Sequence, residues 1–133
     1  MSYLSPELNE SDINRISTLG LAYMGDCVFE MLIRTYLISE GHTAALDLHH
    51  SAVGLVNAPA QHAFYERISC LLDAEEAEIY RRGRNAKVNS VPHNASVADY
   101  HSATGLEALF GWLFLNGRRD RVEELFQAGM REL

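Results

Sequence analysis

Apolar residues recur along the chain at the spacing of helices rather than with the alternation of strands. In the first such segment the pattern begins near Ile16 and continues to about Ser39, and Gly41 is a typical helix end. No segment has the strict apolar–polar alternation of a half-buried strand. The pattern therefore predicts an all-α protein.

Capping and turn-forming residues divide the rest of the chain into further helices. Their expected ranges, with the residues that mark their ends, are 43–56 (Thr43), 57–72 (Asn57 and Pro59), 73–83 (Asp73 and Glu76), 96–115 (Ser96, Asp99 and Gly117) and 120–131. Residues 84–95, which are rich in Asn and include Pro92, are expected to form a loop. About six helices in 133 residues indicate one helical bundle, a single domain that spans residues 1–133.

The composition indicates a cytoplasmic protein that does not cross a membrane. Asp26 and Glu107 interrupt the two most apolar segments, so neither segment provides the roughly 18 consecutive apolar residues of a membrane span. The N-terminal residues lack the basic and apolar regions of a signal peptide. Cys27 and Cys70 lack metal-ligand spacing, and we interpret them as reduced thiols that pack in the core.

Charge is distributed unevenly along the chain. The net charge of −7 argues against a protein that binds nucleic acid through an overall positive charge. However, no acidic residue lies between Glu78 and Asp99, and this stretch contains four cations within seven positions: Arg81, Arg82, Arg84 and Lys87. A second basic cluster lies near the C-terminus and contains Arg118, Arg119 and Arg121. Such local concentrations are compatible with an enzyme whose substrate is a polyanion.

Two isolated acids lie in apolar helical segments that are both expected to be largely buried. Asp26 is the only charged residue in the range 16–29, and Glu107 is the only acid in the range 100–117. A buried carboxylate costs several kcal/mol unless it is paired, hydrogen-bonded or bound to a metal. Two explanations remain open: ion pairs with arginines such as Arg15 or Arg34, or a shared cation such as Mg²⁺. Glycines beside the acids favour close approach of a backbone or ligand: Gly25, Gly105 and Gly111.

Three segments of the chain resemble motifs of the ribonuclease III family. The segment LAYMGDCVFE (21–30) is similar to the signature helix with its catalytic aspartate. The segment RRGRNAK (81–87) is similar to a motif of the Mini-ribonuclease III branch, and TGLEALFGWLFL (104–115) is similar to the second acidic helix of the family. Together these motifs are specific, and the resemblance covers nearly the whole chain. Full-length ribonuclease III carries further acids at the positions of Leu19, Ala22 and Thr104. The Mini branch shares this thinner set of acids and has no double-stranded-RNA-binding domain.

The resemblance implies a metal-dependent endoribonuclease that cleaves both strands of double-stranded RNA and leaves 5′-phosphate ends. It assigns Asp26 and Glu107 as catalytic and metal-binding residues, with Mg²⁺ as the cofactor and Mn²⁺ as a substitute. The implied substrate is the precursor of 23S ribosomal RNA, and a ribosomal protein is a candidate partner. The implied assembly is a homodimer formed through the signature helix, with one active site in each protomer.

The segment 81–87 is the expected RNA-binding region. We expect five of its residues to contact phosphates or 2′-hydroxyl groups: Arg81, Arg82, Arg84, Asn85 and Lys87. A-form RNA is recognised mostly through its backbone and 2′-hydroxyl groups, which suits such contacts. The alternative is a solvated helix end, where cations stabilise the helix dipole whether or not RNA is bound. Asn85 is equally compatible with a left-handed turn.

Two other functions remain open on the sequence. A non-catalytic helical module that binds structured RNA or a ribosomal partner would keep the basic segment but would not need both isolated acids. A helical dimer that binds only proteins would leave the acid-free basic segment without a role. The presence of both acids in apolar helices therefore favours the enzyme.

Overall fold

The protein is helical throughout the part of the chain that the structure, a computed structural model, describes: residues 1–87, 90–91 and 96–131. Seven α-helices and one 3₁₀ turn occur in these residues: α1 Glu10–Asn14, α2 Thr18–Ser39, α3 Ala45–Val56, α4 Ala58–Ile68, η1 Ser69–Leu71, α5 Ala74–Arg84, α6 Val97–Leu115 and α7 Arg119–Met130. The same residues contain no strand. The predicted all-α class is confirmed.

Most helix ends lie where the capping residues predict them. Asp73 and Glu76 form the expected capping box at the start of α5, because each side chain accepts a hydrogen bond from the other residue's backbone N–H, at 2.8 and 2.9 Å. Ser96 caps α6 through the backbone N–H of Asp99 at 3.0 Å. Asn57 caps α4 in the same way. These local side-chain signals therefore predict helix starts reliably in this chain.

Four details of the helices differ from the expectation. The short helix α1 was not predicted, since its five residues bury one apolar side chain, Ile13, and show no periodicity. The residue before α3 is Ala44, so Thr43 does not cap this helix. The helix α4 ends at Ile68 and continues as the tighter turn η1. Arg84 is the last residue of α5 rather than the first of a loop.

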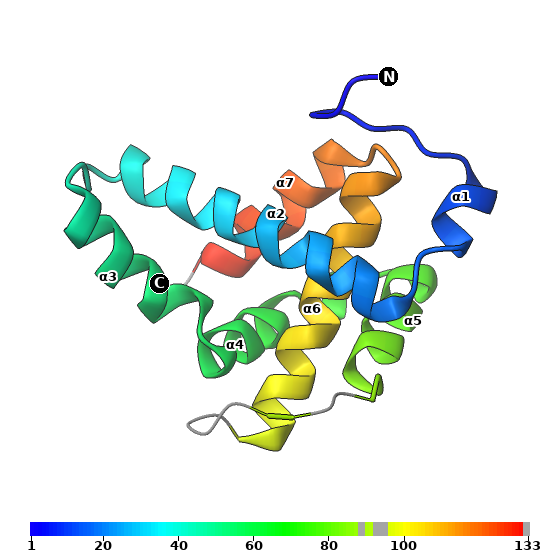
Figure 1. Ribbon diagram of the computed structural model, residues 1–133. Helices are drawn as coiled ribbons and strands as arrows, with labels where there is room; N and C mark the ends of the chain where they lie inside the picture. The colour runs from blue at the N-terminus through cyan, green and yellow to red at the C-terminus, as the bar shows by residue number, and fades with distance from the viewer. Residues whose placement is uncertain (88–89, 92–95, 132–133) are drawn as a thin grey trace.

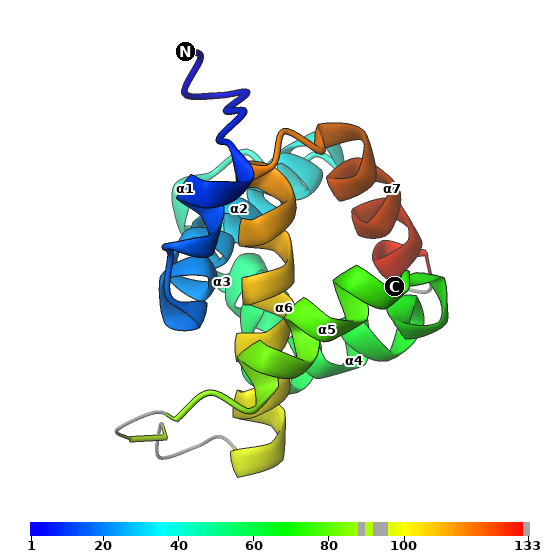
Figure 2. The same cartoon turned by 90° about the vertical axis from the view of Figure 1, so that its right-hand side faces the viewer.

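The helix α6 is the centre of the bundle. Figures 1 and 2 show α2 crossing α6 on one side, with α4, α5 and α7 on the other. Almost every residue of α6 from Ser102 to Leu113 is buried, and Glu107 is the half-buried exception. A helix that is apolar around its whole circumference is stable only inside a protein. Its composition therefore accounts for its central position.

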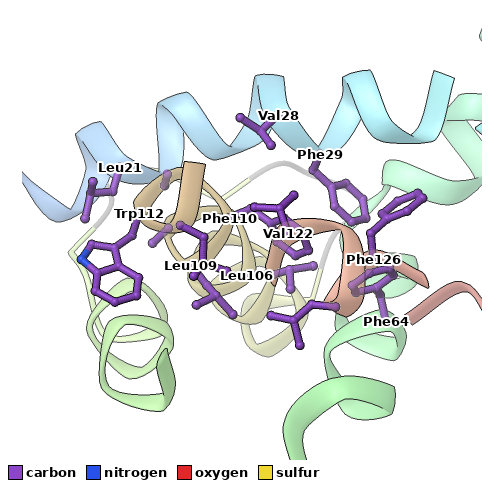
Figure 3. Close-up of a cluster of buried hydrophobic side chains, with 14 of the residues drawn as sticks. Leu21, Val28, Phe29, Phe64, Leu106, Leu109, Phe110, Trp112, Val122 and Phe126 are labelled. Carbon is purple, nitrogen blue, oxygen red and sulfur yellow. The ribbon is translucent and has the colours of Figure 1, made fainter. Parts of the chain in front are cut away.

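Four phenylalanines join α6 to three of the helices around it. Phe29 of α2, Phe64 of α4, Phe110 of α6 and Phe126 of α7 form a cluster in the core (Figure 3). The ring centroids of Phe29 lie 5.1 Å from Phe64, 5.6 Å from Phe110 and 6.2 Å from Phe126, with the rings edge to face. This arrangement is favourable for aromatic pairs. The cluster fixes α2 against α6 on the side of the crossing nearer the C-terminus of α2.

Two glycines bring the backbones of α2 and α6 into direct contact. A Cβ atom on Gly25 would lie 1.6 Å from the carbonyl oxygen of Glu107, and one on Gly111 would lie 2.0 Å from that of Leu21. No side chain fits at either position, so the helices cross closely at these residues. Asp26 follows Gly25 directly and Glu107 precedes Gly111 by about one turn. The crossing therefore brings the two isolated acids together.

A buried ion pair joins α5 to α7. Arg121 donates to both oxygens of Glu76, each at 2.8 Å, and to the carbonyl oxygen of Leu71 at 2.7 Å. The acid-rich start of α5 would be expected to face solvent, but only 1% of the Glu76 side chain is exposed. Replacing Arg121 would leave the buried Glu76 carboxylate without compensation. Arg121 is therefore a structural residue.

Two expectations from composition can also be compared with the structure. Cys27 and Cys70 are both exposed, so the interpretation as core thiols is wrong. No helix among the described residues covers the outer face of α2, which leaves Cys27 at the surface. Among the described residues, no helix combines the length and apolar character needed to span a membrane.

The glycine crossing gives a stability prediction with an internal control. Gly25→Ala and Gly111→Ala should each destabilise the protein by about 1–3 kcal/mol or more, because the added methyl overlaps backbone atoms of the facing helix. Gly54→Ala, within α3 and with no atom within 4 Å of the added Cβ, should stabilise it by about 0.5–1 kcal/mol. Urea denaturation measures all three. Equal small effects at the three positions would contradict the close crossing.

Candidate active site

Asp26 and Glu107 form the acidic pair at the crossing of α2 and α6. The two carboxyl groups share a hydrogen bond, although Asp26 is exposed and Glu107 half-buried. The expectation that both acid-bearing helices are largely buried holds for α6 and is wrong for α2. The apolar outer face of α2 is uncovered, which leaves Asp26 at the solvent edge.

The ion-pair explanation for these acids is not realised in the described residues. None of the ion pairs there includes Asp26 or Glu107. Arg34 instead pairs with Glu30, its neighbour one turn earlier on α2, at 3.2 Å. The two acids therefore face each other without an arginine to neutralise them.

This arrangement changes the protonation of Glu107. Burial raises the pKa of Glu107 to about 8, with further contributions from the negative charge of Asp26 and from the hydrogen bond to Asp26. A hydrogen bond from Gln61 acts in the opposite direction and lowers the pKa. At neutral pH without a cation, Glu107 is therefore largely protonated and donates to the Asp26 carboxylate. A cation bound between the two groups would favour the ionised form of both.

The donor atoms of this site suit a hard divalent cation. Mg²⁺ prefers oxygen ligands and is commonly held by one or two carboxylates, with water and substrate phosphate completing its coordination. Asp26 and Glu107 would provide the two carboxylates. In the described part of the chain, no group of three or more His, Cys, Asp or Glu side chains is placed to hold a metal.

Gln61 is the site residue that the sequence analysis did not identify. It lies on α4, is 4% exposed, and its amide hydrogen-bonds to Glu107. A signal was present in the sequence, because Gln61, Phe64 and Ile68 share one face of α4 at helical spacing and all three are buried. A polar residue at such an inward position indicates a specific partner.

The expected RNA-binding residues lie at the C-terminal end of α5. Arg81 and Arg82 are exposed, and both pair with Glu78, at 2.6 and 3.6 Å respectively. Arg84 lies over the ring of Tyr80, 5.9 Å from its centroid. Arg81 and Arg82 thus have local partners that support the solvated-helix alternative for these two residues.

Asn85 and Lys87 follow α5 directly. Asn85 is the C-cap residue with φ −92°, so the left-handed turn considered for it does not occur. Lys87 is exposed, and the structure describes no ion pair for it or for Arg84. Val88, Asn89 and residues 92–95 of the expected loop lie outside the described residues.

A second glycine contact holds the basic segment against α6. A Cβ atom on Gly83 would lie 2.7 Å from the Cα atom of Gly105, so α5 and α6 also touch through their backbones. Gly105 precedes Glu107 by two residues and Gly83 precedes Arg84 by one. The contact therefore fixes the basic segment within one turn of Glu107 along α6, although residues two positions apart point to different sides of a helix.

The raised pKa of Glu107 predicts how stability depends on pH. The unfolded carboxyl ionises near pH 4.5 and the folded one near pH 8, so between these values the unfolded state binds fewer protons. Without metal, stability should therefore be highest below this window and fall as pH rises through it. Each kcal/mol lost lowers Tm by about 3–5 °C in a domain of this size.

Glu107→Gln should remove this pH dependence and should be at least as stable as wild type at pH 8 in EDTA, since it has no charge to bury. Calorimetry of both proteins between pH 5 and 8 provides the measurement. Parallel Tm profiles would contradict the raised pKa. A large loss of stability in the variant would indicate that Glu107 is held by an ion pair.

Comparison with known proteins supports the resemblance of the three motifs. The sequence model of the Ribonuclease III domain matches residues 19–118, a range that contains both acids. A Mini-ribonuclease 3 of Clostridium tetani is 39% identical over 126 residues, which cover 94% of this chain and 83% of the relative. A Mini-ribonuclease 3 of Symbiobacterium thermophilum is 41% identical over 83% of this chain and 85% of the relative.

The fold is also found in a solved structure. The crystal structure of a Fusobacterium nucleatum protein matches with a TM-score of 0.79 and 31% sequence identity, over 87% of this chain and 89% of that protein. Fold, motifs and relatives agree over most of the chain. The chain belongs to the ribonuclease III family and, within it, to the Mini-ribonuclease 3 branch.

Proposed function

We propose that the protein is a metal-dependent endoribonuclease that cleaves double-stranded RNA. The observation that carries the proposal is the pair of facing carboxyl groups, Asp26 and Glu107, with which no arginine of the described residues pairs. Membership of the ribonuclease III family supports the same reaction class. Without a cation, this pair costs stability, so a purely structural role would not account for it.

The residues of the chain have distinct tasks in this proposal. Asp26 and Glu107 hold Mg²⁺, for which Mn²⁺ is a substitute, and the exposed position of Asp26 leaves the site open to the RNA backbone. When bound, Mg²⁺ activates the attacking water and stabilises the leaving oxygen of the phosphodiester. Gln61 and the surrounding core keep Glu107 on its buried side. The products are 5′-phosphate and 3′-hydroxyl ends.

The basic segment 81–87 holds the RNA next to this pair. Arg84 and Lys87 are exposed and provide the principal phosphate contacts, and Asn85 contributes a hydrogen bond to a 2′-hydroxyl. Arg81 and Arg82 add positive charge that Glu78 partly offsets. The attachment of α5 to α6 at Gly83 and Gly105 supports this placement, because it sets the cations at a fixed position relative to Glu107.

A homodimer formed through α2 is part of the proposal. Large apolar side chains are exposed along its outer face, with Leu19 41%, Tyr23 85%, Met31 49% and Ile38 56% exposed. Asp26 and Cys27 line the same surface hollow as Tyr23, Met31 and Ile38. Contiguous apolar surface of this kind marks an interface. A second copy on this face would place each acidic pair at the rim of the interface, one site for each strand.

The natural substrate in this proposal is the precursor of 23S ribosomal RNA, which is processed in the cytoplasm. This substrate is the one that the resemblance of the three motifs to the Mini branch implies, and the chain belongs to that branch. A ribosomal protein bound to that RNA is a candidate partner. The competing function, a non-catalytic module that binds structured RNA, would need the basic segment but not the acidic pair.

The acidic pair can be tested by neutral substitutions of similar shape. Asp26→Asn and Glu107→Gln should each strongly reduce cleavage of a long duplex RNA in Mg²⁺. Loss of a group that only orients a metal ligand lowers activity roughly 10–100-fold, and loss of a ligand itself should lower it by more. Glu30→Gln is the matched control, since Glu30 lies one turn further along α2 and pairs with Arg34. Near wild-type cleavage by either active-site variant would refute the assignment. Binding of RNA without cleavage by the wild type would favour the non-catalytic module.

The basic segment can be tested by RNA binding in Ca²⁺, where cleavage should be slow. Arg84→Ala with Lys87→Ala should raise Kd uniformly across duplex sequences and flatten its salt dependence, because each phosphate contact adds up to about one unit of log–log slope. The preferred cleavage positions should not change. The double variant Arg118→Ala with Arg119→Ala is measured for comparison. If RNA binding weakened only in this second variant, the RNA-binding surface would lie at the α6–α7 turn instead.

The dimer can be tested by sedimentation. Wild type should sediment at about twice 14.9 kDa at micromolar concentration, and Met31→Glu should shift it towards the monomer because two copies would place like charges in an apolar contact. Leu46→Glu is the control, since Leu46 is 70% exposed on α3. A monomeric wild type that still cleaves both strands would disprove the dimer.

A further inference from the structure

Buried polar side chains in the described residues each need a partner. Four polar or charged residues are buried there: Gln61, Glu76, Ser102 and Thr104. Three have structural partners: Glu76 binds Arg121, the Ser102 hydroxyl contacts His62 and Tyr80, and the Thr104 hydroxyl donates to the carbonyl oxygen of Tyr100. The side-chain partner that the structure gives Gln61 is Glu107. Gln61 therefore faces the acidic pair rather than a packing contact.

The position of Gln61 on α4 is otherwise suited to an apolar residue. Phe64 and Ile68, one and two turns later on the same face, are 2% and 0% exposed and belong to the core. Burying an amide costs free energy unless its hydrogen bonds are made. An apolar residue would fit this face of α4 without that cost. The amide therefore indicates a requirement of Glu107, not of the fold.

The neighbouring contacts fix Gln61 in place. The next residue, His62, is hydrogen-bonded through Nδ1 to the hydroxyl of Ser102 on α6 at 2.7 Å. The Ser102 hydroxyl is in turn 2.8 Å from the hydroxyl of Tyr80 on α5. These bonds join α4, α5 and α6 immediately beside Gln61, so its backbone has little freedom to move away from Glu107. The amide is thus preorganised towards the carboxyl group.

A neutral amide has properties that a charged partner would lack. Its N–H donates to a carboxylate oxygen and so satisfies the buried side of Glu107. Because it carries no charge, it does not neutralise Glu107 and does not compete with a cation for it. An arginine at this position would form an ion pair and occupy the carboxylate. The residue type therefore matches a carboxylate that has to remain available to a metal.

We propose that Gln61 is a positioning residue of the metal site, whose amide N–H holds one oxygen of Glu107 and so directs the other towards Asp26 and the cation. The inference rests on the proposed function, in which Asp26 and Glu107 bind the metal. Groups that orient a metal ligand in this way commonly contribute about 10–100-fold to metal affinity. Gln61 touches neither the RNA nor the metal itself.

The test is Mn²⁺ binding by the purified protein without RNA, measured by titration calorimetry. Gln61→Met, which keeps the length of the side chain and removes the amide, should weaken Mn²⁺ binding about tenfold or more. Gln61→Asn, which is one methylene shorter, should show a similar loss because its amide does not reach Glu107. Thr104→Val is the matched control, since it removes a buried hydroxyl one turn from Glu107 and should leave Mn²⁺ affinity unchanged.

Four outcomes decide between the inference and the proposed function. Loss of affinity in both Gln61 variants, with folding retained in thermal denaturation and no loss in Thr104→Val, supports the positioning role. If Asp26→Asn abolishes Mn²⁺ binding but Gln61→Met binds as tightly as wild type, the inference fails and the proposed function stands. If Asp26→Asn binds Mn²⁺ as well as wild type, the metal site itself is wrong and the inference fails with it. An equal loss in Thr104→Val would assign the effect to packing and overturn the positioning role.

Discussion

The backbone contact between α2 and α6 at Gly25 and Gly111 is the constraint on which the acidic pair depends. Each glycine meets a carbonyl oxygen of the facing helix, so the crossing leaves no space for a side chain. Asp26 and Glu107 lie within one turn of these glycines and face each other for that reason. The central position of α6 and the phenylalanine cluster hold the crossing in place (Figure 3). The core thus determines where two negative charges meet.

The proximity of the two carboxyl groups costs electrostatic free energy that no ion pair in the described residues offsets. Burial and the charge of Asp26 raise the pKa of Glu107 to about 8, and no arginine in the described residues pairs with either acid. By contrast, the other buried acid, Glu76, has Arg121 as a bidentate partner. The molecule therefore neutralises the Glu76 carboxylate with an arginine, whereas Glu107 has no such partner in the described residues. This difference is the physical basis on which we interpret Glu76 as structural and propose Glu107 as a metal ligand.

Much of this arrangement could be predicted from the sequence, because the signals are local. Capping residues mark the starts of α4, α5 and α6, and the glycines beside Asp26 and Glu107 indicate a close approach. The pairing of Glu76 with Arg121 could not be predicted, since it joins residues 45 positions apart. The exposure of Asp26 could not be predicted either, because it depends on which face of α2 the other helices cover. The helix α3 packs against α2 but leaves its outer face exposed. The role of Gln61 could not be predicted, because its partner Glu107 lies on another helix and no local signal in the sequence indicates the packing of α4 against α6.

Asp26 lies on the same face of α2 as the exposed apolar side chains Tyr23, Met31 and Ile38, and the proposed activity requires a cation between Asp26 and Glu107. Diffraction from crystals soaked in Mn²⁺ tests this requirement most directly. The account predicts an anomalous difference peak within coordination distance of both carboxylates, absent in Asp26→Asn crystals. A wild-type structure with no peak at this pair, despite Mn²⁺ bound elsewhere on the protein, would contradict it.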